Sequence, residues 1–159
     1  MPLPAVVRSQ YRAALAMLQQ AVEACPAALW HAPADQPKFW QVAYHALFYT
    51  HLYLQPSEAD FHPWARHMPA AHDLSAAPAA ALYSPADLLE YLALCRQQVD
   101  AHTAHLDPEA PSGFDWLLFT KLELQFYTIR HIQQHAGELM GRLGANATRA
   151  LDWVGTQPD

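Results

Sequence analysis

Apolar side chains recur along the chain at the three- and four-residue spacing of amphipathic helices, and prolines separate these segments. The first segment ends at Pro26, and its apolar stripe consists of Val7, Tyr11, Leu15, Leu18 and Val22. The second segment, residues 38–55, is apolar over more than half of its circumference, which predicts a helix buried on two sides. Asp35 or Gln36 is its expected N-cap, with Pro37 in the first turn.

Two further helices are predicted in the second half of the chain. Ser84 is the expected N-cap of the third, followed by Pro85 at its first position, and residues 107–111 end it. The apolar stripe of this helix is Leu88, Leu92, Cys95, Val99 and Leu106. The fourth is expected to begin at Ser112 and to end at Gly144.

The remaining segments are predicted to be a long connection and a tail. Residues 56–84 contain four prolines and are too long for an ordinary connection between packed helices, which is typical of a lid. Phe61 and Trp64 are the expected apolar anchors of this loop, and Trp153 is expected to attach the tail, residues 145–159, to the bundle. No strand alternation or repeat is visible, so the pattern predicts one all-α domain over residues 1–159, a four-helix bundle with a long connection between its second and third helices.

Composition narrows the range of partners. Of 159 residues only 15% are charged, the net charge is −6, and the nine basic residues are scattered from Arg8 to Arg149. A nucleic-acid partner is therefore not expected, because phosphate binding requires a concentrated basic face. No apolar run approaches the roughly 20 residues of a membrane span, no signal peptide is visible, and Cys25 and Cys95 are isolated. We therefore expect a cytoplasmic protein that does not bind membranes.

The histidines are the residues that most directly indicate a chemical function. His131 and His135 stand four residues apart on the last predicted helix, a spacing that can direct both rings to one metal ion. The glutamate of a zinc-protease HExxH motif is missing between them, which excludes that reading. His45, in the middle of the second helix, is the expected third ligand. Glu138 is either a fourth ligand or an acceptor for an imidazole N–H.

The other histidines are less suited to such a site. His51 lies about 120° from His45 around the helix and is expected to face the rim or another interface. His102 should lie about 21 Å from His131 along the bundle. The loop contributes three more at five-residue spacing, with a small chance that one covers the metal: His62, His67 and His72.

The segments WQVAYHALFY and RHIQQHAGEL, together with the helix lengths, resemble the DinB/YfiT-like superfamily, and the resemblance extends from the first helix to WVG in the tail. It implies a four-helix bundle, often a homodimer, that binds a divalent metal ion through His45, His131 and His135. Several members of that family resemble transferases that join a low-molecular-weight thiol to an electrophile. This sequence shows no thiol-binding motif, so the substrate stays open.

Three functions are compatible with this pattern. Three imidazoles leave a position open on the ion, at which a thiol would lose its proton or water would be activated. Zn²⁺ and Ni²⁺ suit imidazole ligands best, and Fe²⁺ and Mn²⁺ are not excluded. The nearest candidates to contact a group bound to the ion are Tyr49, Tyr91 and Tyr127. The alternatives to a thiol transferase are a hydrolase and a non-catalytic protein in which the ion only ties two helices together. A haem site is disfavoured, because adjacent histidines on one helix cannot bind opposite faces of the iron.

Overall fold

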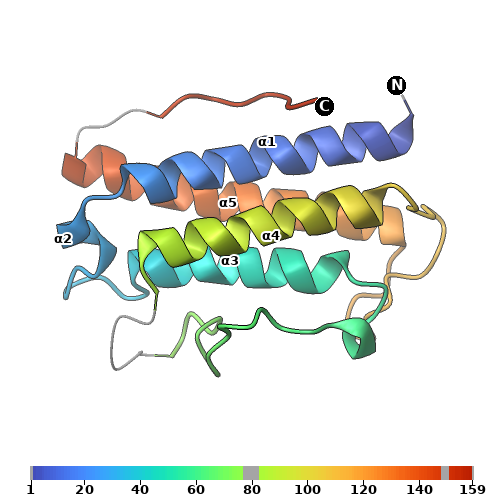
Figure 1. Cartoon of the computed structure of the whole chain (residues 1–159), viewed down its shortest axis with the longest axis horizontal. Coiled ribbons are helices and arrows are strands. Elements are labelled where there is room, and N and C mark those ends of the chain that lie inside the picture. The colour runs from blue at the N-terminus through green and yellow to red at the C-terminus, as the bar shows by residue number, and fades with distance from the viewer. Residues whose placement is uncertain (1, 77–82, 148–150, 159) are drawn as a thin grey trace.

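Four long helices make up most of the protein (Figure 1). They are α1 (Leu3–Ala24), α3 (Phe39–Leu54), α4 (Pro85–Thr103) and α5 (Lys121–Ala147), with a short α2 (Ala27–Trp30) and a 3-10 turn η1 (Glu58–Asp60). The structure, a computed structural model, describes residues 2–76, 83–147 and 151–158. Within these ranges the only strand-like pairing is an isolated bridge between Pro111 and Thr120, so the all-α prediction is confirmed.

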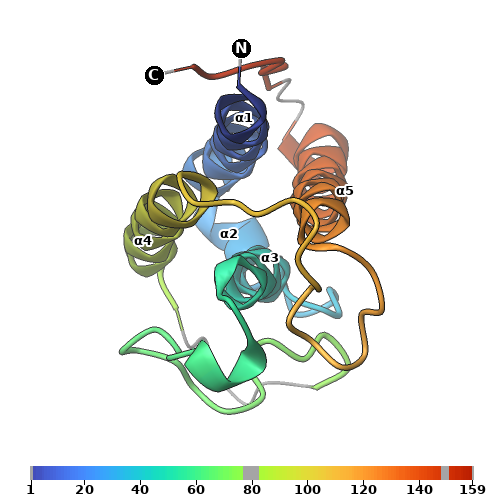
Figure 2. The ribbon, with the colours of Figure 1, turned by 90° about the vertical axis from the view of Figure 1, so that its right-hand side faces the viewer.

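The four long helices form a bundle in which α1 lies diagonally opposite α3 (Figure 2). Each of these two packs against both α4 and α5. Because α3 and α4 run in the same direction, the chain must return along the whole bundle between them (Figure 1). This return explains the length of the connection that the sequence places after Pro56. Large side chains fill the space between the helices, among them the fully buried Trp30, Trp40, Tyr11, Tyr44 and Tyr91.

Helix α3 is the most enclosed element, as its apolar sequence predicts. Fourteen of its sixteen residues are buried, and the two that keep partial exposure are His45 and Tyr49. The helix begins later than expected, because its N-cap is Lys38, two residues after Gln36 and three after Asp35. The Nζ atom of Lys38 donates to three carbonyl oxygens of the preceding turn, which holds the start of α3 in place.

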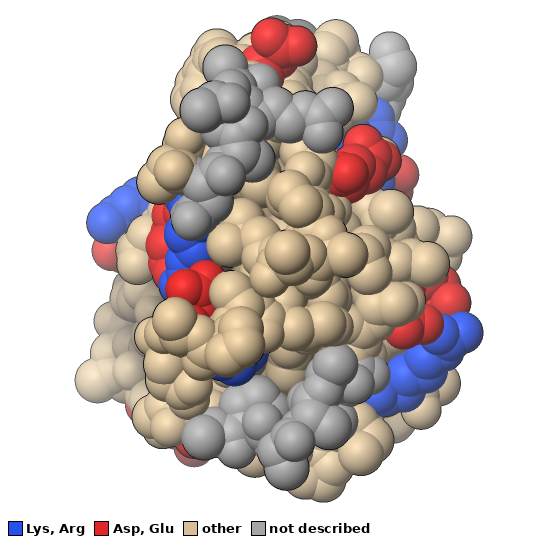
Figure 3. Space-filling view, turned by 90° about the vertical axis from the view of Figure 1, so that its left-hand side faces the viewer, with Lys and Arg blue, Asp and Glu red and all other residues tan. Residues whose placement is uncertain are grey.

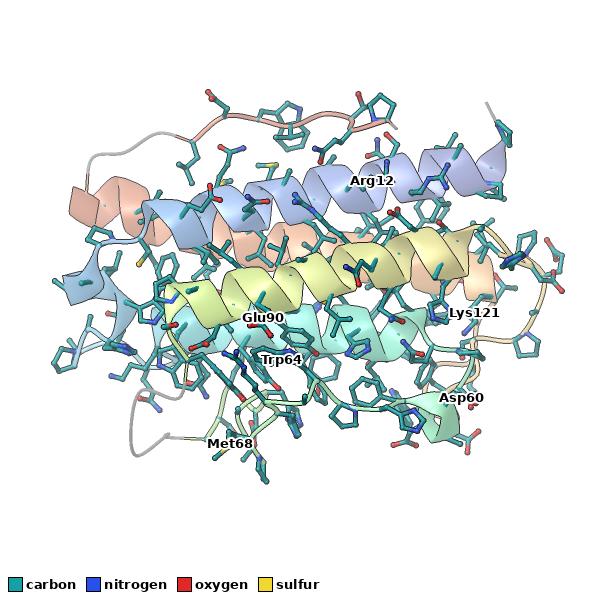
Figure 4. The ribbon with its side chains drawn as sticks, viewed as in Figure 1. Arg12, Asp60, Trp64, Met68, Glu90 and Lys121 are labelled. Atoms are coloured by element: carbon teal, nitrogen blue, oxygen red, sulfur yellow. The ribbon has the colours of Figure 1, made fainter. Side chains whose placement is uncertain are left out.

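The long connection lies along α3 and is attached to both α3 and α4 (Figure 4). Trp64 is 7% exposed and stacks on Tyr91 with ring centroids 4.7 Å apart, and the partly buried Phe61 packs against Phe48. Arg66 forms ion pairs with Asp87 and Glu90 of α4. Both predicted anchors therefore pack onto the bundle; residues 77–82 of the loop lie outside the described residues.

The predicted start of the last helix is wrong. Residues 112–120 form a compact loop, and α5 begins at Lys121. Gly113 has a φ of 89°, and a Cβ atom there would lie 1.9 Å from the carbonyl oxygen of Pro56, so the chain cannot be helical at this point. Ser112, instead of capping a helix, donates its hydroxyl to the carbonyl of Leu117 at 2.6 Å.

The predicted end of α5 and the anchor of the tail are also wrong. Helix α5 continues through Gly144, which does not adopt the left-handed conformation of a terminating glycine. Trp153 is 73% exposed. Side chains of α1 hold the backbone of the tail instead: the amide of Gln20 pairs with the backbone N–H and carbonyl of Asp152, and Gln10 donates to the carbonyl of Gly155.

Charged side chains are dispersed over the surface. On the end of the bundle shown in Figure 3, basic and acidic groups form small separate clusters around an uncharged centre. No helix among the described residues combines the length and the apolar character needed to cross a bilayer.

Candidate metal centre

Three histidines from two helices converge at one point between α3 and α5. His45 comes from α3, while His131 and His135 lie one turn apart on α5. The Nε2 atom of His131 is 3.1 Å from that of His45 and 3.1 Å from that of His135. Among the described residues these three form the one group of histidine, cysteine and carboxylate side chains close enough to share an ion.

The outer nitrogens of two rings have hydrogen-bond acceptors. The Nδ1–H of His45 donates to the carbonyl oxygen of His72 at 2.7 Å, and the Nδ1–H of His135 donates to a carboxylate oxygen of Glu138 at 3.1 Å. These bonds place the lone pairs of both rings on Nε2, which faces the centre of the group. The Nδ1 atom of His131 is buried and has no partner among the described residues.

The spacing of the three nitrogens fits a bound cation. Lone pairs that face one another at 3.1 Å repel unless a proton or a cation lies between them. Three nitrogens bound tetrahedrally to Zn²⁺ at its usual bond length are separated by about 3.3 Å. The two separations that involve His131 are close to that value, and the ligand atoms of all three rings lie within 4.8 Å of one another, so the residues present fit a divalent ion.

Burial keeps these rings in the form that binds metal. His135 is buried, and His45 and His131 are partly buried. Burial lowers the pKa of His45 to about 4, and burial together with the neighbouring His135 lowers the pKa of His131 to about 3. Both rings are therefore neutral at neutral pH, as coordination requires.

Glu138 acts on the ring of His135 instead of joining the histidine group. Its Oε2 atom accepts from His135, and its Oε1 atom accepts from Arg142. Arg142 also donates to the carbonyl of Pro37, which ties this end of α5 to the chain before α3. Of the two roles left open by the sequence, the structure favours the hydrogen-bond acceptor.

The other histidines lie outside this group. Of the two places expected for His51, the structure shows an interface and not the rim: the residue is 6% exposed, and its Nδ1 atom lies 3.3 Å from the hydroxyl of Tyr91 of α4. His102 pairs with Gln98 on its own helix. In the loop, His67 bonds to the hydroxyl of Tyr44, and the ring of His72 stacks on Phe48 with centroids 4.2 Å apart.

Two of the three expected tyrosines lie beside the site. The ring of Tyr49 is 4.7 Å from that of His45 and 5.7 Å from that of His131. Tyr127 lines a groove of about 410 Å³ that opens next to His131, together with Arg130, Gln133 and Gln134. Tyr91 is buried against Trp64 and His51, on the α4 side of α3.

Sequence reasoning missed three parts of this centre. Arg130 adds a positive charge to the groove, the carbonyl of His72 orients His45, and Gln41 holds the loop that carries this carbonyl. Arg130 could have been found from its position directly before His131. The other two contacts depend on the path of the loop, which no residue pattern indicates.

The chain matches the DinB superfamily over residues 10–139, which include all three histidines. No curated protein and no solved structure matches the chain.

Proposed function

The chain therefore belongs to the DinB superfamily, and on that basis we propose that it is an enzyme that binds one divalent metal ion through His45, His131 and His135 and transfers a low-molecular-weight thiol to an electrophilic small molecule. The observation that carries this proposal is the convergence of three imidazole side chains beside a groove that is open to solvent. Zn²⁺ and Ni²⁺ are the ions best suited to such ligands.

An ion held by three side chains keeps a coordination position for a substrate. The bound ion would lower the pKa of a thiol that occupies this position, and so would supply thiolate at neutral pH. The chain's own cysteines are unsuited to this task. Burial raises the pKa of Cys25 to about 12 and raises that of the fully buried Cys95 as well. The sulfur nucleophile must therefore come from a small molecule.

The groove beside His131 is the proposed binding place for the electrophile. Tyr127 supplies an aromatic wall, Arg130 a positive charge, and Gln133 and Gln134 amide groups. In the transfer, the thiolate sulfur gives its electron pair to a carbon of the electrophile, and a carbon–sulfur bond forms. The electron pair of the broken bond leaves with the halide of an aryl halide, and the thiol proton goes to solvent. With an epoxide the pair stays on the oxygen of the opened ring, which then takes up a proton.

The test is a conjugation assay on metal-loaded protein, metal-free protein and the His45→Ala variant. Each is incubated with a panel of cellular thiols and an aryl halide or an epoxide, and the adduct is followed by mass spectrometry. We expect adduct only with the loaded wild type, a rate that disappears with chelator, and recovery on addition of Zn²⁺ or Ni²⁺. Equal rates for all three preparations would overturn the transferase proposal.

The same preparations distinguish the alternatives. Hydrolysis of a test ester or amide by the loaded form alone would assign metal-activated water as the nucleophile. A non-catalytic role would give a raised unfolding temperature without turnover, because the ion would tie α3 to α5. At 100 times its dissociation constant a ligand adds about 2.7 kcal/mol to the free energy of unfolding.

We also propose that the protein forms a homodimer. Support comes from three large apolar side chains near the start of α5 that remain exposed in the single chain: Trp116 at 51%, Leu118 at 92% and Phe126 at 53%. Exposed apolar side chains that gather into one surface commonly mark a protein interface, and the variant below tests whether these side chains form one. Sedimentation equilibrium should give twice the chain mass for the wild type, and the chain mass for a Leu118→Glu, Phe126→Glu variant.

A further inference from the structure

One short stretch of the long loop, residues 72–76, is held by two side chains of α3 that lie one helical turn apart. His45 donates to the carbonyl of His72, and the side-chain amide of Gln41 donates to the carbonyls of Asp73 at 2.7 Å and Ala76 at 3.0 Å. The loop is thus attached to α3 next to the histidine group. The proposed metal ligand His45 and the neighbouring amide of Gln41 therefore bond to the same stretch of loop backbone.

Gln41 is an unusual residue in the first turn of an otherwise apolar helix. It is fully buried, and all of its polar atoms have partners, since its Oε1 atom also accepts from the backbone N–H of Lys38. A buried amide costs free energy unless it is fully hydrogen-bonded. Its partners are all backbone groups, so its bonds fix the path of the chain and do not depend on the loop's side chains.

The path of the loop decides which nitrogen of His45 carries the proton. With the carbonyl of His72 at 2.7 Å, the proton is held on Nδ1, and Nε2 presents its lone pair to His131 and His135. Without this acceptor the neutral ring can carry its proton on Nε2 instead, which blocks coordination. Second-sphere acceptors of this kind typically change metal affinity tenfold to a hundredfold.

We propose that Gln41 is a positioning residue for the metal centre: by clamping residues 73–76 it holds the carbonyl of His72 against His45, which selects the tautomer that can bind an ion. This inference rests on the metal binding proposed above, but not on the thiol-transfer activity. It makes the loop part of the centre, and by linkage a bound ion should also stabilise the loop.

The chain offers two informative controls. Gln55 is also a buried glutamine, next to the other end of α3, where its amide donates to the carbonyl of His51 and to Gln98. Gln55→Met thus repeats the chemistry of Gln41→Met away from the histidine group. His72→Phe keeps the backbone carbonyl and the stacking on Phe48, but removes a ring whose own Nδ1 is buried and without a partner among the described residues.

The experiment measures Zn²⁺ affinity by competition with a chromogenic chelator for the wild type and these three variants. We expect Gln41→Met to bind Zn²⁺ about tenfold more weakly. Gln55→Met should bind as the wild type does, and His72→Phe should weaken binding less than Gln41→Met, because the carbonyl that orients His45 stays in place. Imidazole ¹⁵N spectra of the metal-free proteins should show His45 protonated on Nδ1 in the wild type and in Gln55→Met, and a mixture of tautomers in Gln41→Met.

Hydrogen exchange adds a reciprocal measurement. Zn²⁺ should slow exchange at the amides of residues 73–76 in the wild type, and much less in Gln41→Met. If Gln41→Met does not fold, Gln41→Glu takes its place, because an ionised carboxylate keeps the size and the acceptor for Lys38 but cannot donate.

The possible outcomes separate the two proposals. Wild-type affinity and an unchanged His45 tautomer in the Gln41 variant would overturn the positioning role, while leaving the metal centre intact. Loss of Zn²⁺ in His72→Phe together with an unaffected Gln41→Met would also overturn it and would make the His72 ring a ligand. Weaker binding in Gln41→Met combined with no thiol transfer by any protein would support the inference and reject the transferase.

Discussion

His45 and His51 lie six residues apart on the same helix and share most of the properties by which functional histidines are sought. Both have little contact with water, and burial lowers the pKa of each to about 4. They differ in what their rings face. The Nε2 atom of His45 faces two other imidazoles, which belong to α5. The ring of His51 faces the hydroxyl of Tyr91 and the ring of Phe61.

The comparison shows that burial and a perturbed pKa do not by themselves indicate a site. A tyrosine hydroxyl can donate or accept, so it satisfies a neutral imidazole without any ligand. Three imidazole nitrogens directed at one another instead need a shared proton or a cation between them. The convergence of these nitrogens, and not the lowered pKa, therefore marks the candidate metal centre.

The largest expected difference is in metal affinity after removal of each ring. His45→Ala should weaken Zn²⁺ binding by more than about a hundredfold, beyond the loss typical for second-sphere partners. His51→Ala should leave the affinity unchanged and lower the free energy of unfolding by about 1–2 kcal/mol. Chelator competition and urea unfolding of both variants check this, and equal metal affinities would remove the distinction between the two histidines.

The second prediction concerns the loop beside His51. Trp64→Ala removes the ring that stacks on Tyr91 and should cost about 3 kcal/mol of stability, as for other buried aromatic residues. Zn²⁺ affinity should fall less than in Gln41→Met, because the bonds of Gln41 to residues 73–76 stay in place. A larger loss of affinity in Trp64→Ala would mean that the whole loop, and not its 72–76 stretch, orients His45.

A smaller effect is expected at Glu138. Replacing it by alanine removes the acceptor that orients the ring of His135, and Zn²⁺ affinity should fall about tenfold. Gln98→Ala, which removes the partner of His102 on another helix, is the matched control and should not change the affinity. If both variants bound Zn²⁺ equally well, the carboxylate would have no part in the centre.

The last expected effect is a pH dependence of stability in the metal-free protein. The pKa of His51 falls from 6.5 in the unfolded chain to about 4 in the folded one, so the unfolded state takes up a proton first as the pH decreases. The free energy of unfolding should therefore decline between pH 6.5 and pH 4, by about 1.4 kcal/mol per unit of pKa difference before solvent screening reduces it.

Urea titrations at several pH values test this contribution. His51→Phe should decline less steeply over that interval than the wild type. Identical slopes for the two proteins would show that His51 does not titrate differently in the folded and unfolded states.

The helices were predictable where a local pattern determines them. The hydroxyl of Ser84 accepts from the backbone of Asp87, as its position before Pro85 predicts, and the enclosed character of α3 follows from its apolar sequence. The start of α5 was not predictable in this way. It depends on the close approach of Gly113 to the carbonyl of Pro56, a contact between segments far apart in the chain.

The candidate site likewise has parts that the sequence predicts and parts that it does not. The spacing of His131 and His135 and the central position of His45 are properties of the sequence, and the structure brings all three together. That they bind a metal stays a prediction. The acceptor that orients His45 is a backbone carbonyl of the loop, and bonds to other backbone carbonyls fix the path of that loop. Every residue has the same carbonyl, so no sequence pattern could predict these contacts.

The most direct test of the three-histidine centre is X-ray absorption spectroscopy of the Zn²⁺-loaded protein. The account predicts one ion per chain with three imidazole ligands at about 2.0–2.1 Å and at least one further light atom that is exchangeable. Addition of a small thiol should replace that atom by sulfur at about 2.3 Å. A spectrum with fewer than three imidazoles, or one that is unchanged in His131→Ala, would contradict it.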